Sequence, residues 1–236
     1  MDFGEFVLAA STADLADEPA AREHADAVEF RMDLAEDPLV QLDGYDGDLP
    51  VLATNRPTWE GGEADGGDGA GDPANRDRLR TLARAAERHA VEAIDVELAT
   101  AREQDGRHTI EAARDHGAAV VVSSHDFEGT PGGDGLRERL DAATDAGDVG
   151  KLAVTAEDAG DVLRLLSVTL EFAQGGDRVA TMAMGEAGRH SRAVAPLYGS
   201  RIGYAPVDPA DATAPGQYDL ATLRGLVDRL GGKPEG

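Results

Sequence analysis

The chain has 236 residues, with 46 acidic against 22 basic side chains and a formal net charge of −24 at pH 7. Phosphates are bound by basic surfaces, so this charge argues against a nucleic acid or an anionic membrane as partner. There is no cysteine for disulfides or thiolate metal sites, no signal peptide and no apolar run of about 20 residues. We therefore expect a cytoplasmic protein.

Eight short apolar runs follow one another along the chain, mostly separated by amphipathic stretches. Several are rich in valine without alternation, which is typical of parallel strands buried on both faces. The predicted strands are 6–11, 27–33, 49–56, 93–99, 118–127, 150–156, 178–184 and 199–207.

Helical periodicity marks the stretches 76–91, 157–173 and 217–230. In the second of these, Val162, Leu166 and Leu170 recur every four residues, and Leu163 and Leu165 broaden the apolar stripe. This alternation predicts an α/β fold, a single (β/α)8 TIM barrel occupying residues 1–236 as one domain, with no added N-terminal subdomain. An open doubly wound sheet is the alternative, because periodicity does not show that a sheet closes.

One segment of low complexity, "EGGEADGGDGAGDPAN" at 60–75, follows the third predicted strand. Asp72 stands where a dinucleotide-binding fingerprint needs its third glycine, and no P-loop lysine follows. We expect a mobile loop over the end of that strand rather than a nucleotide site.

Charged and polar side chains stand late in most of the predicted strands, and the carboxyl ends of barrel strands carry catalytic groups. Charges there are costly unless they are paired or used. A salt-bridge network that caps the barrel is the structural alternative, and an acidic pair on one strand could have a supporting role. These residues are Glu29, Arg31, Thr54, Arg56, Asp95, Glu97 and 123–126, while Lys151 and Ser200 stand earlier in their runs.

Lys151 is one of only two lysines, and the other, Lys233, lies in the C-terminal tail. A lysine in an apolar strand can act as a nucleophile, because desolvation favours the neutral amine that attacks a carbonyl. An ion pair with a buried acid is the structural alternative. His125, which ends the preceding predicted strand, is the candidate base. No pair of histidines has the spacing of a zinc helix, so we expect no catalytic metal.

The near-absence of lysine also bears on the acidic composition. At roughly 1 M salt the electrostatic screening length is about 3 Å, so repulsion among surface carboxylates is suppressed. The composition predicts a protein adapted to molar salt, as in an extreme halophile; an ordinary acidic protein is the alternative.

Taken together in chain order, these segments resemble the type I 3-dehydroquinate dehydratases, barrel lyases of the shikimate pathway that act through a Schiff base. The similarity covers nearly the whole chain, and its specificity comes from the order of the motifs, since each is weak alone. The segments are "EFRMD" (29–33), "TNRPTWEGG" (54–62), "DVEL" (95–98), "SSHDFEGTP" (123–131), "GKLAVTA" (150–156), "HSRAVAPLYGS" (190–200) and "TAPGQ" (213–217).

The resemblance implies syn elimination of water from 3-dehydroquinate, a small-molecule substrate, to give 3-dehydroshikimate without a cofactor. Lys151 would form the imine with the ketone. His125 would remove the neighbouring proton and later protonate the departing hydroxyl, while Glu60 would orient that histidine. Arg192 would hold the substrate carboxylate. The other implied substrate-binding residues are Glu29, Arg31, Arg56, Thr213 and Gln217.

The chain departs from the family pattern in two places. We expect no counterpart of the N-terminal hairpin that closes the barrel floor in many members, and the glycine- and aspartate-rich loop after Glu60 is unusual. We expect a homodimer. The alternatives are a class I aldolase, which also uses a Schiff-base lysine, and a sensor that binds quinate or dehydroquinate without turnover.

Overall fold

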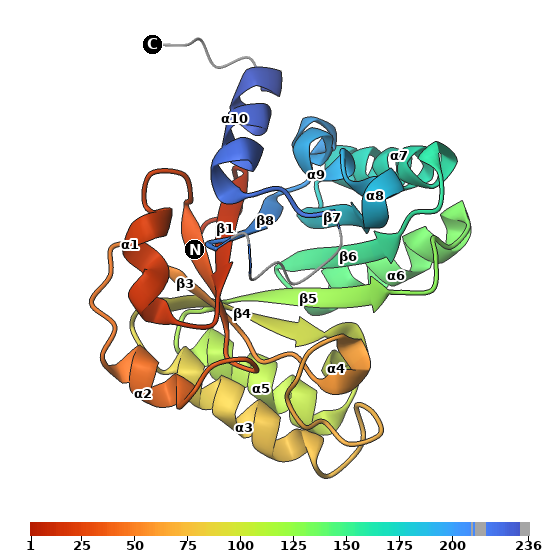
Figure 1. The fold of residues 1–236 in the computed structure, drawn as a ribbon. Coiled ribbons are helices and arrows are strands. Elements are labelled where there is room, and N and C mark those ends of the chain that lie inside the picture. Colours follow the sequence, from red (N-terminus) through yellow and green to blue (C-terminus); the bar gives the residue numbers. More distant parts are fainter. Residues whose placement is uncertain (209, 211–215, 232–236) are drawn as a thin grey trace.

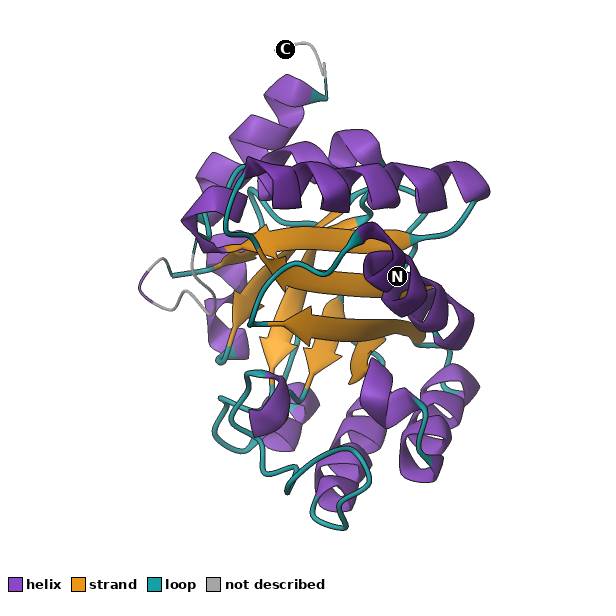
Figure 2. Cartoon of the chain, turned by 90° about the vertical axis from the view of Figure 1, so that its right-hand side faces the viewer, coloured by secondary structure: helices purple, strands orange, loops and turns teal. Residues whose placement is uncertain are grey.

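Eight parallel strands form one sheet whose order, β7-β6-β5-β4-β3-β2-β1-β8, follows the chain. The computed structural model describes residues 1–208, 210 and 216–231. Helices surround the strands on the outside (Figures 1 and 2). The strands are β1 (Val7–Thr12), β2 (Ala27–Arg31), β3 (Val51–Thr54), β4 (Val91–Glu97), β5 (Ala119–Asp126), β6 (Val149–Thr155), β7 (Val179–Met184) and β8 (Ile202–Pro206).

The sheet comes close to closing between β7 and β8. Val179 forms a parallel bridge with Ser200, and the backbone N–H of Arg201 donates to the carbonyl of Val179 at 2.7 Å. The backbone N–H of Thr181 donates to the Ser200 hydroxyl at 3.0 Å. A doubly wound sheet would reverse its strand order part-way, so the consecutive order and this seam identify a barrel and exclude the open alternative.

The three predicted helices are present, together with shorter ones that connect the strands. Figure 1 shows α3 and α5 packed together below the sheet. No helix in the described part of the chain combines the length and apolar character needed to cross a membrane. The helices are η1 (Leu15–Asp17), α1 (Glu18–Ala21), α2 (Pro38–Asp43), η2 (Thr58–Glu60), α3 (Asn75–Ala86), α4 (Leu98–Ala101), α5 (Gln104–Asp115), α6 (Gly133–Ala146), α7 (Ala159–Gly175), α8 (Gly185–Gly188), α9 (Ser191–Val194), η3 (Ala195–Tyr198) and α10 (Leu220–Leu230).

The apolar stripe of α7 is narrower than the sequence predicts. The helix begins at Asp158, whose carboxylate accepts from the backbone N–H groups of Gly160 and Asp161, and it buries Val162 and Leu166 as expected. Leu163 and Leu170 are 66% and 38% exposed, because they lie on the opposite side from the face that covers the barrel. The predicted apolar stripe is thus only partly buried.

The floor of the barrel is closed by the start of the chain. Residues 1–6 form neither helix nor strand. Phe3 is 2% exposed and packs with Val7 and Ile202 among the inward-facing apolar side chains, with Met1 beside them. The N-terminal ammonium is 2.7 Å from the Glu92 carboxylate. A single aromatic ring thus fills the space at the amino ends of the strands.

Candidate active site

The strands place apolar and polar side chains at different depths inside the barrel. Alternate residues of a strand face the same side, and the first inward residues of β2, β4, β5 and β6 are Ala27, Ala93, Val121 and Val149, all in the interior apolar cluster. Two residues further along come Glu29, Asp95, Ser123 and Lys151, all buried. The barrel is therefore apolar toward its floor and polar toward the carboxyl ends of its strands.

A pocket of about 580 Å³ opens at this polar end. Every residue to which the family resemblance assigns a role lines it, except Thr213, which lies outside the described residues. Of the other polar residues expected at the strand ends, Thr54 lines it, whereas Asp95, Glu97, Ser123, Ser124 and Asp126 do not. Ser200 also stays away from the pocket, because it belongs to the seam between β7 and β8. The lining comprises Glu29, Arg31, Thr54, Arg56, Glu60, Gly61, His125, Phe127, Lys151, Ala153, Met182, Met184, Arg192, Tyr204 and Gln217.

Lys151 projects from the middle of β6 and is 4% exposed. Its Nζ donates to Asp95 Oδ2 at 3.0 Å, so the ion pair considered as the structural alternative is present. The same nitrogen lies 4.2 Å from the centroid of the Tyr204 ring. The amine is thus held between a carboxylate and an aromatic face, at the floor of an open pocket.

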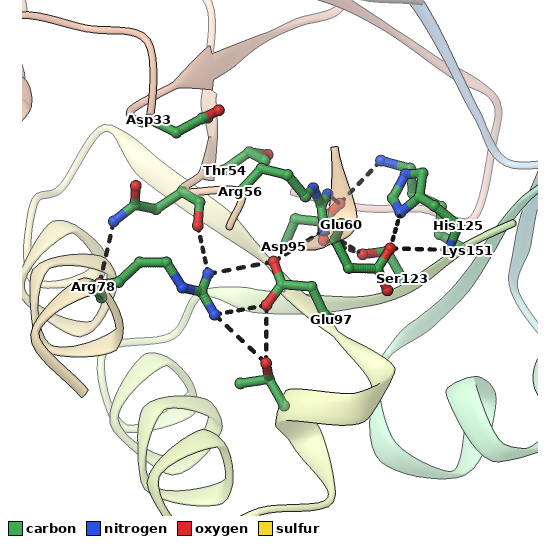
Figure 3. Close-up of polar contacts among 12 residues, drawn as sticks. Asp33, Thr54, Arg56, Glu60, Arg78, Asp95, Glu97, Ser123, His125 and Lys151 are labelled. Carbon is green, nitrogen blue, oxygen red and sulfur yellow. Dashed lines mark hydrogen bonds and ion pairs between the residues drawn. The ribbon is translucent and has the colours of Figure 1, made fainter. Parts of the chain in front are cut away.

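Asp95 is the centre of a chain of buried charges that runs from Lys151 back to α3 (Figure 3). Its carboxylate also pairs with Arg56 at 2.9 Å and accepts from the Ser123 hydroxyl at 2.6 Å. Burial alone would raise the pKa of Asp95, but Arg56, Lys151 and the Ser123 hydrogen bond outweigh it and hold the pKa below its ordinary value. Asp95 therefore remains anionic beside the lysine.

Beyond Asp95 the chain continues through Glu97, which no solvent reaches. Glu97 lies 3.0 Å from Arg56 and 2.7 Å from Arg78, a residue in the first turns of α3. Arg78 also donates to the backbone carbonyl of Asn55 and to the side chain of Asn75. Two buried acids and two buried arginines on three elements thus anchor the guanidinium of Arg56 at the edge of the pocket.

His125 and Glu60 face the pocket from β5 and the η2 turn (Figure 3). Glu60 Oε2 lies 3.0 Å from His125 Nδ1 and accepts the backbone N–H of His125 at 3.2 Å. Burial raises the pKa of Glu60 to about 7, and Arg56 opposes that rise. Burial, with Arg56 and Lys151 nearby, holds the pKa of His125 well below its usual 6.5. The imidazole is accordingly neutral at neutral pH.

The remaining cations occupy different parts of the wall. Arg31 makes a two-pronged contact with Asp33, at 2.9 and 2.7 Å. Arg192 is 5% exposed, and within the described residues its Nε has no hydrogen-bond acceptor. Burial lowers the pKa of its guanidinium to about 10, which still leaves it charged at pH 7. An arginine in this setting is suited to bind an anionic group that enters the pocket.

Two glycines in positive-φ conformations shape the mouth. Gly61, at φ +80°, lies under Phe127, and a Cβ there would approach that ring to 2.5 Å. Phe127 in turn stacks on the His125 ring, with centroids 5.9 Å apart. Gly216, at φ +77°, sits against the carbonyl of Gly185, where a Cβ would come within 2.6 Å. These close approaches place the Glu60 turn and Gln217 at the rim.

Four pocket residues were not predicted from the sequence, namely Phe127, Met182, Met184 and Tyr204. Three of them follow from the alternation of inward-facing residues along β7 and β8. Lys151 pairs in register with Ala180, and Tyr204 pairs with Ala9, so residues two positions apart on β7 and β8 continue the inward-facing series. Apolar and aromatic side chains in that series were not predicted as pocket residues, because local sequence does not show which layer of the barrel borders the pocket.

None of the described residues form a group of three or more histidine, aspartate or glutamate side chains arranged to hold a metal ion. A buried lysine beside a neutral histidine in a barrel pocket is instead the arrangement of barrel enzymes that form imines with carbonyl substrates.

Comparison with known proteins specifies this class further. The family model of type I 3-dehydroquinase matches residues 7–234. The chain is 60% identical to 3-dehydroquinate dehydratase of Haloarcula marismortui over 98% of both chains, and 53% identical to that of Halobacterium salinarum over 98% of this chain and all of the relative. The solved 3-dehydroquinate dehydratase of Geobacillus kaustophilus superposes with a TM-score of 0.83 at 26% identity, covering 98% of this chain and 93% of the other. The chain belongs to the type I 3-dehydroquinase family.

Proposed function

We propose that Lys151, His125 and Glu60 carry out the dehydration of 3-dehydroquinate to 3-dehydroshikimate, the third step of the shikimate pathway toward aromatic amino acids. Membership of the type I family makes this protein a 3-dehydroquinate dehydratase that acts through a Schiff base. The observation that supports the residue roles is the convergence of a buried lysine and a neutral histidine on one pocket.

The first step is attack of Lys151 Nζ on the ketone carbon. The carbonyl oxygen leaves as water, and an iminium takes its place. The Asp95 carboxylate, 3.0 Å from Nζ, balances the positive charge of the iminium nitrogen. The iminium withdraws electrons from the neighbouring carbon, whose C–H bond becomes acidic.

His125 performs the elimination. Its neutral imidazole takes a proton from the carbon next to the iminium, and the electron pair moves onto the nitrogen to give an enamine. The enamine then expels the hydroxyl one carbon further on, which takes the same proton from His125 and leaves as water. Hydrolysis of the conjugated iminium releases the product and restores the amine. Glu60 orients the ring through Nδ1 and leaves Nε2 for both transfers.

The pocket wall supplies the binding groups. Arg192 binds the substrate carboxylate, since it is a buried cation whose Nε finds no acceptor within the described chain. Glu29, Arg31 and Arg56 contact the substrate hydroxyls. Glu29 is fixed by the Ser11 and Thr54 hydroxyls at 2.5 and 3.1 Å. Gln217 contributes from the rim of the pocket, and Thr213, which lies outside the described residues, is also assigned to substrate binding.

Borohydride trapping with 3-dehydroquinate, followed by peptide mapping, tests these assignments. We expect the adduct on Lys151, and none with Lys151→Ala, which should fold because Asp95 keeps Arg56 and Ser123 as partners. His125→Ala should still give the adduct but lose about 10²–10⁴ in kcat, the usual contribution of a positioned proton-transfer group. An adduct that persists in Lys151→Ala would move the nucleophile to another residue.

We further propose a homodimer, with the chain as one cytoplasmic domain. Large apolar side chains are exposed on α7 (Leu163 and Leu170) and on the adjacent η3 (Leu197 and Tyr198). Burial of apolar surface between two copies would remove them from water. Light scattering on the wild type and on Leu163→Glu tests whether the protein is a dimer. A single cooperative unfolding transition would support one domain. Cell fractionation tests the cytoplasmic location.

A further inference from the structure

Tyr204 brings into the barrel a hydroxyl that has no hydrogen-bond partner in the part of the chain that the structure describes. It is an inward-facing residue of β8, lines the pocket and is 5% exposed. Its Oη is buried, and none of the residues in the described ranges forms a hydrogen bond with it. Buried polar atoms are almost always paired, so an unpaired hydroxyl at a binding site indicates a partner that arrives with the ligand.

The ring of Tyr204 is held at the reactive nitrogen. Lys151 Nζ is 4.2 Å from the ring centroid, at a distance where a cation is attracted to the aromatic face. Asp95 is 3.0 Å from the same nitrogen. An iminium carries the same positive charge as the ammonium, so the attraction between ring and nitrogen continues after the imine forms. The phenol therefore keeps its place beside the substrate during the reaction.

The charges around the phenol favour its protonated form. Burial raises the pKa of Tyr204 well above its usual 10, and the carboxylates of Glu29 and Asp95 raise it further, against the opposing influence of Arg56. A neutral phenol among anions acts as a hydrogen-bond donor. Both carboxylates already have donors of their own. The Ser11 and Thr54 hydroxyls donate to the two oxygens of Glu29. Asp95 accepts from Ser123, Lys151 and Arg56.

The position of Lys151 determines which substrate atom the phenol meets. In the imine, the ketone carbon is bonded to Nζ, and the two carbons beside it lie within a bond length or two. One of these carbons loses its proton to His125, and the other carries a hydroxyl. We infer that Tyr204 is a substrate-binding residue whose phenol donates a hydrogen bond to the hydroxyl on the carbon next to the ketone. This inference rests on the proposed function, because it requires the ketone at Lys151.

The test is Tyr204→Phe, which removes one oxygen and keeps the ring at Lys151. We expect KM for 3-dehydroquinate to rise about 3- to 10-fold, the usual net value of one hydrogen bond, with kcat within about threefold of the wild type. An analogue that lacks the hydroxyl next to the ketone should bind equally well to both proteins. A KM that does not change, or an equal loss of affinity for the analogue, would overturn the inference.

Melting temperature provides an independent measurement. Because no described residue pairs with the hydroxyl, Tyr204→Phe should melt no lower than the wild type; a marked fall would assign the hydroxyl to the fold instead. Tyr198→Phe, at a position outside the pocket, is the matched control and should leave KM unchanged. Borohydride trapping separates the two proposals: without an adduct on wild-type Lys151 the proposed function fails, whereas an adduct on both proteins with unchanged KM refutes only the role of Tyr204.

Discussion

Burial shifts the pKa values of His125 and Glu60 in opposite directions. The pKa of Glu60 rises to about 7, while that of His125 falls well below 6.5 because burial, Arg56 and Lys151 all disfavour the imidazolium. Near neutral pH the histidine is ready to accept a proton, and Glu60 is close to its midpoint. The ionised carboxylate can only accept the Nδ1–H, which leaves Nε2 free as the base, whereas a protonated carboxyl can donate to Nδ1 and favour the wrong tautomer. Activity should therefore follow the ionisation of Glu60.

From this we predict that kcat/KM of the wild type rises as pH increases through about 7. Glu60→Gln cannot ionise, so its profile should lose this acidic limb, and its kcat should fall by less than the 10²–10⁴ expected for removal of the base itself. Profiles of kcat/KM from pH 5 to 9 measure both effects. Glu63→Gln, at an exposed position in the same loop, is the control. An acidic limb that survives in Glu60→Gln would belong to another group.

At the scale of elements, α3 contributes to the site although none of its side chains lines the pocket. Arg78, in its first turns, has a side chain that is 1% exposed and pairs with Glu97 at the end of β4. Glu97 in turn holds Arg56, at the pocket wall. The helix is thus tied to the carboxyl end of two neighbouring strands, directly after the loop that follows Glu60. A buried carboxylate deprived of one cationic partner is strongly destabilised.

We predict that Arg78→Met lowers the free energy of unfolding by about 3–5 kcal/mol, the usual cost of breaking a buried pair. For a chain of this length the melting temperature should fall by about 6–20 °C. Arg80→Met removes an exposed arginine from the same helix and should have little effect, since Arg80 pairs with Asp77 only at the surface. Thermal unfolding of the three proteins checks the prediction. The Thr100 hydroxyl donates to Glu97 at 3.1 Å, so equal melting temperatures would show that Arg56 and Thr100 alone satisfy the carboxylate.

At the scale of the whole molecule, an anionic surface surrounds a pocket that binds an anion. The net charge of −24 repels a substrate carboxylate at long range, whereas Arg31, Arg56 and Arg192 attract it inside the pocket. At roughly 1 M salt the screening length is about 3 Å, so the distant repulsion is lost first and the desolvated contacts are affected least. The same salt relieves repulsion among surface carboxylates.

Both kcat/KM and the melting temperature should consequently rise between dilute buffer and molar KCl or NaCl. An enzyme that binds an anion through arginines on a neutral surface would instead weaken. A salt series with both salts, measured by steady-state kinetics and thermal unfolding, checks this. Full activity together with an unchanged melting temperature in dilute buffer would show that the acidic composition is not an adaptation to salt, despite the relatives from Haloarcula and Halobacterium.

The sequence by itself determined how many strands there are, where they lie along the chain, and the chemical character of the pocket. Valine-rich runs are local, so they located β1 to β8 within a few residues, showed Lys151 as a charge inside an apolar strand and placed His125 at the end of the preceding strand. Glu60 was predicted only from the family resemblance, which depends on the order of the motifs. It stands in a turn, where no helical or strand periodicity distinguishes it.

Only the tertiary structure decided how these parts meet. The seam between Val179 and Ser200, Phe3 at the floor and the exposure of Leu163 all depend on contacts between distant segments. The same holds for Lys151 between Asp95 and Tyr204, since β4, β6 and β8 converge only when the barrel closes. Hydrogen bonding and burial depend on distance in space, and a local pattern shows which residues a strand turns inward but not which of them come within 3 or 4 Å of each other.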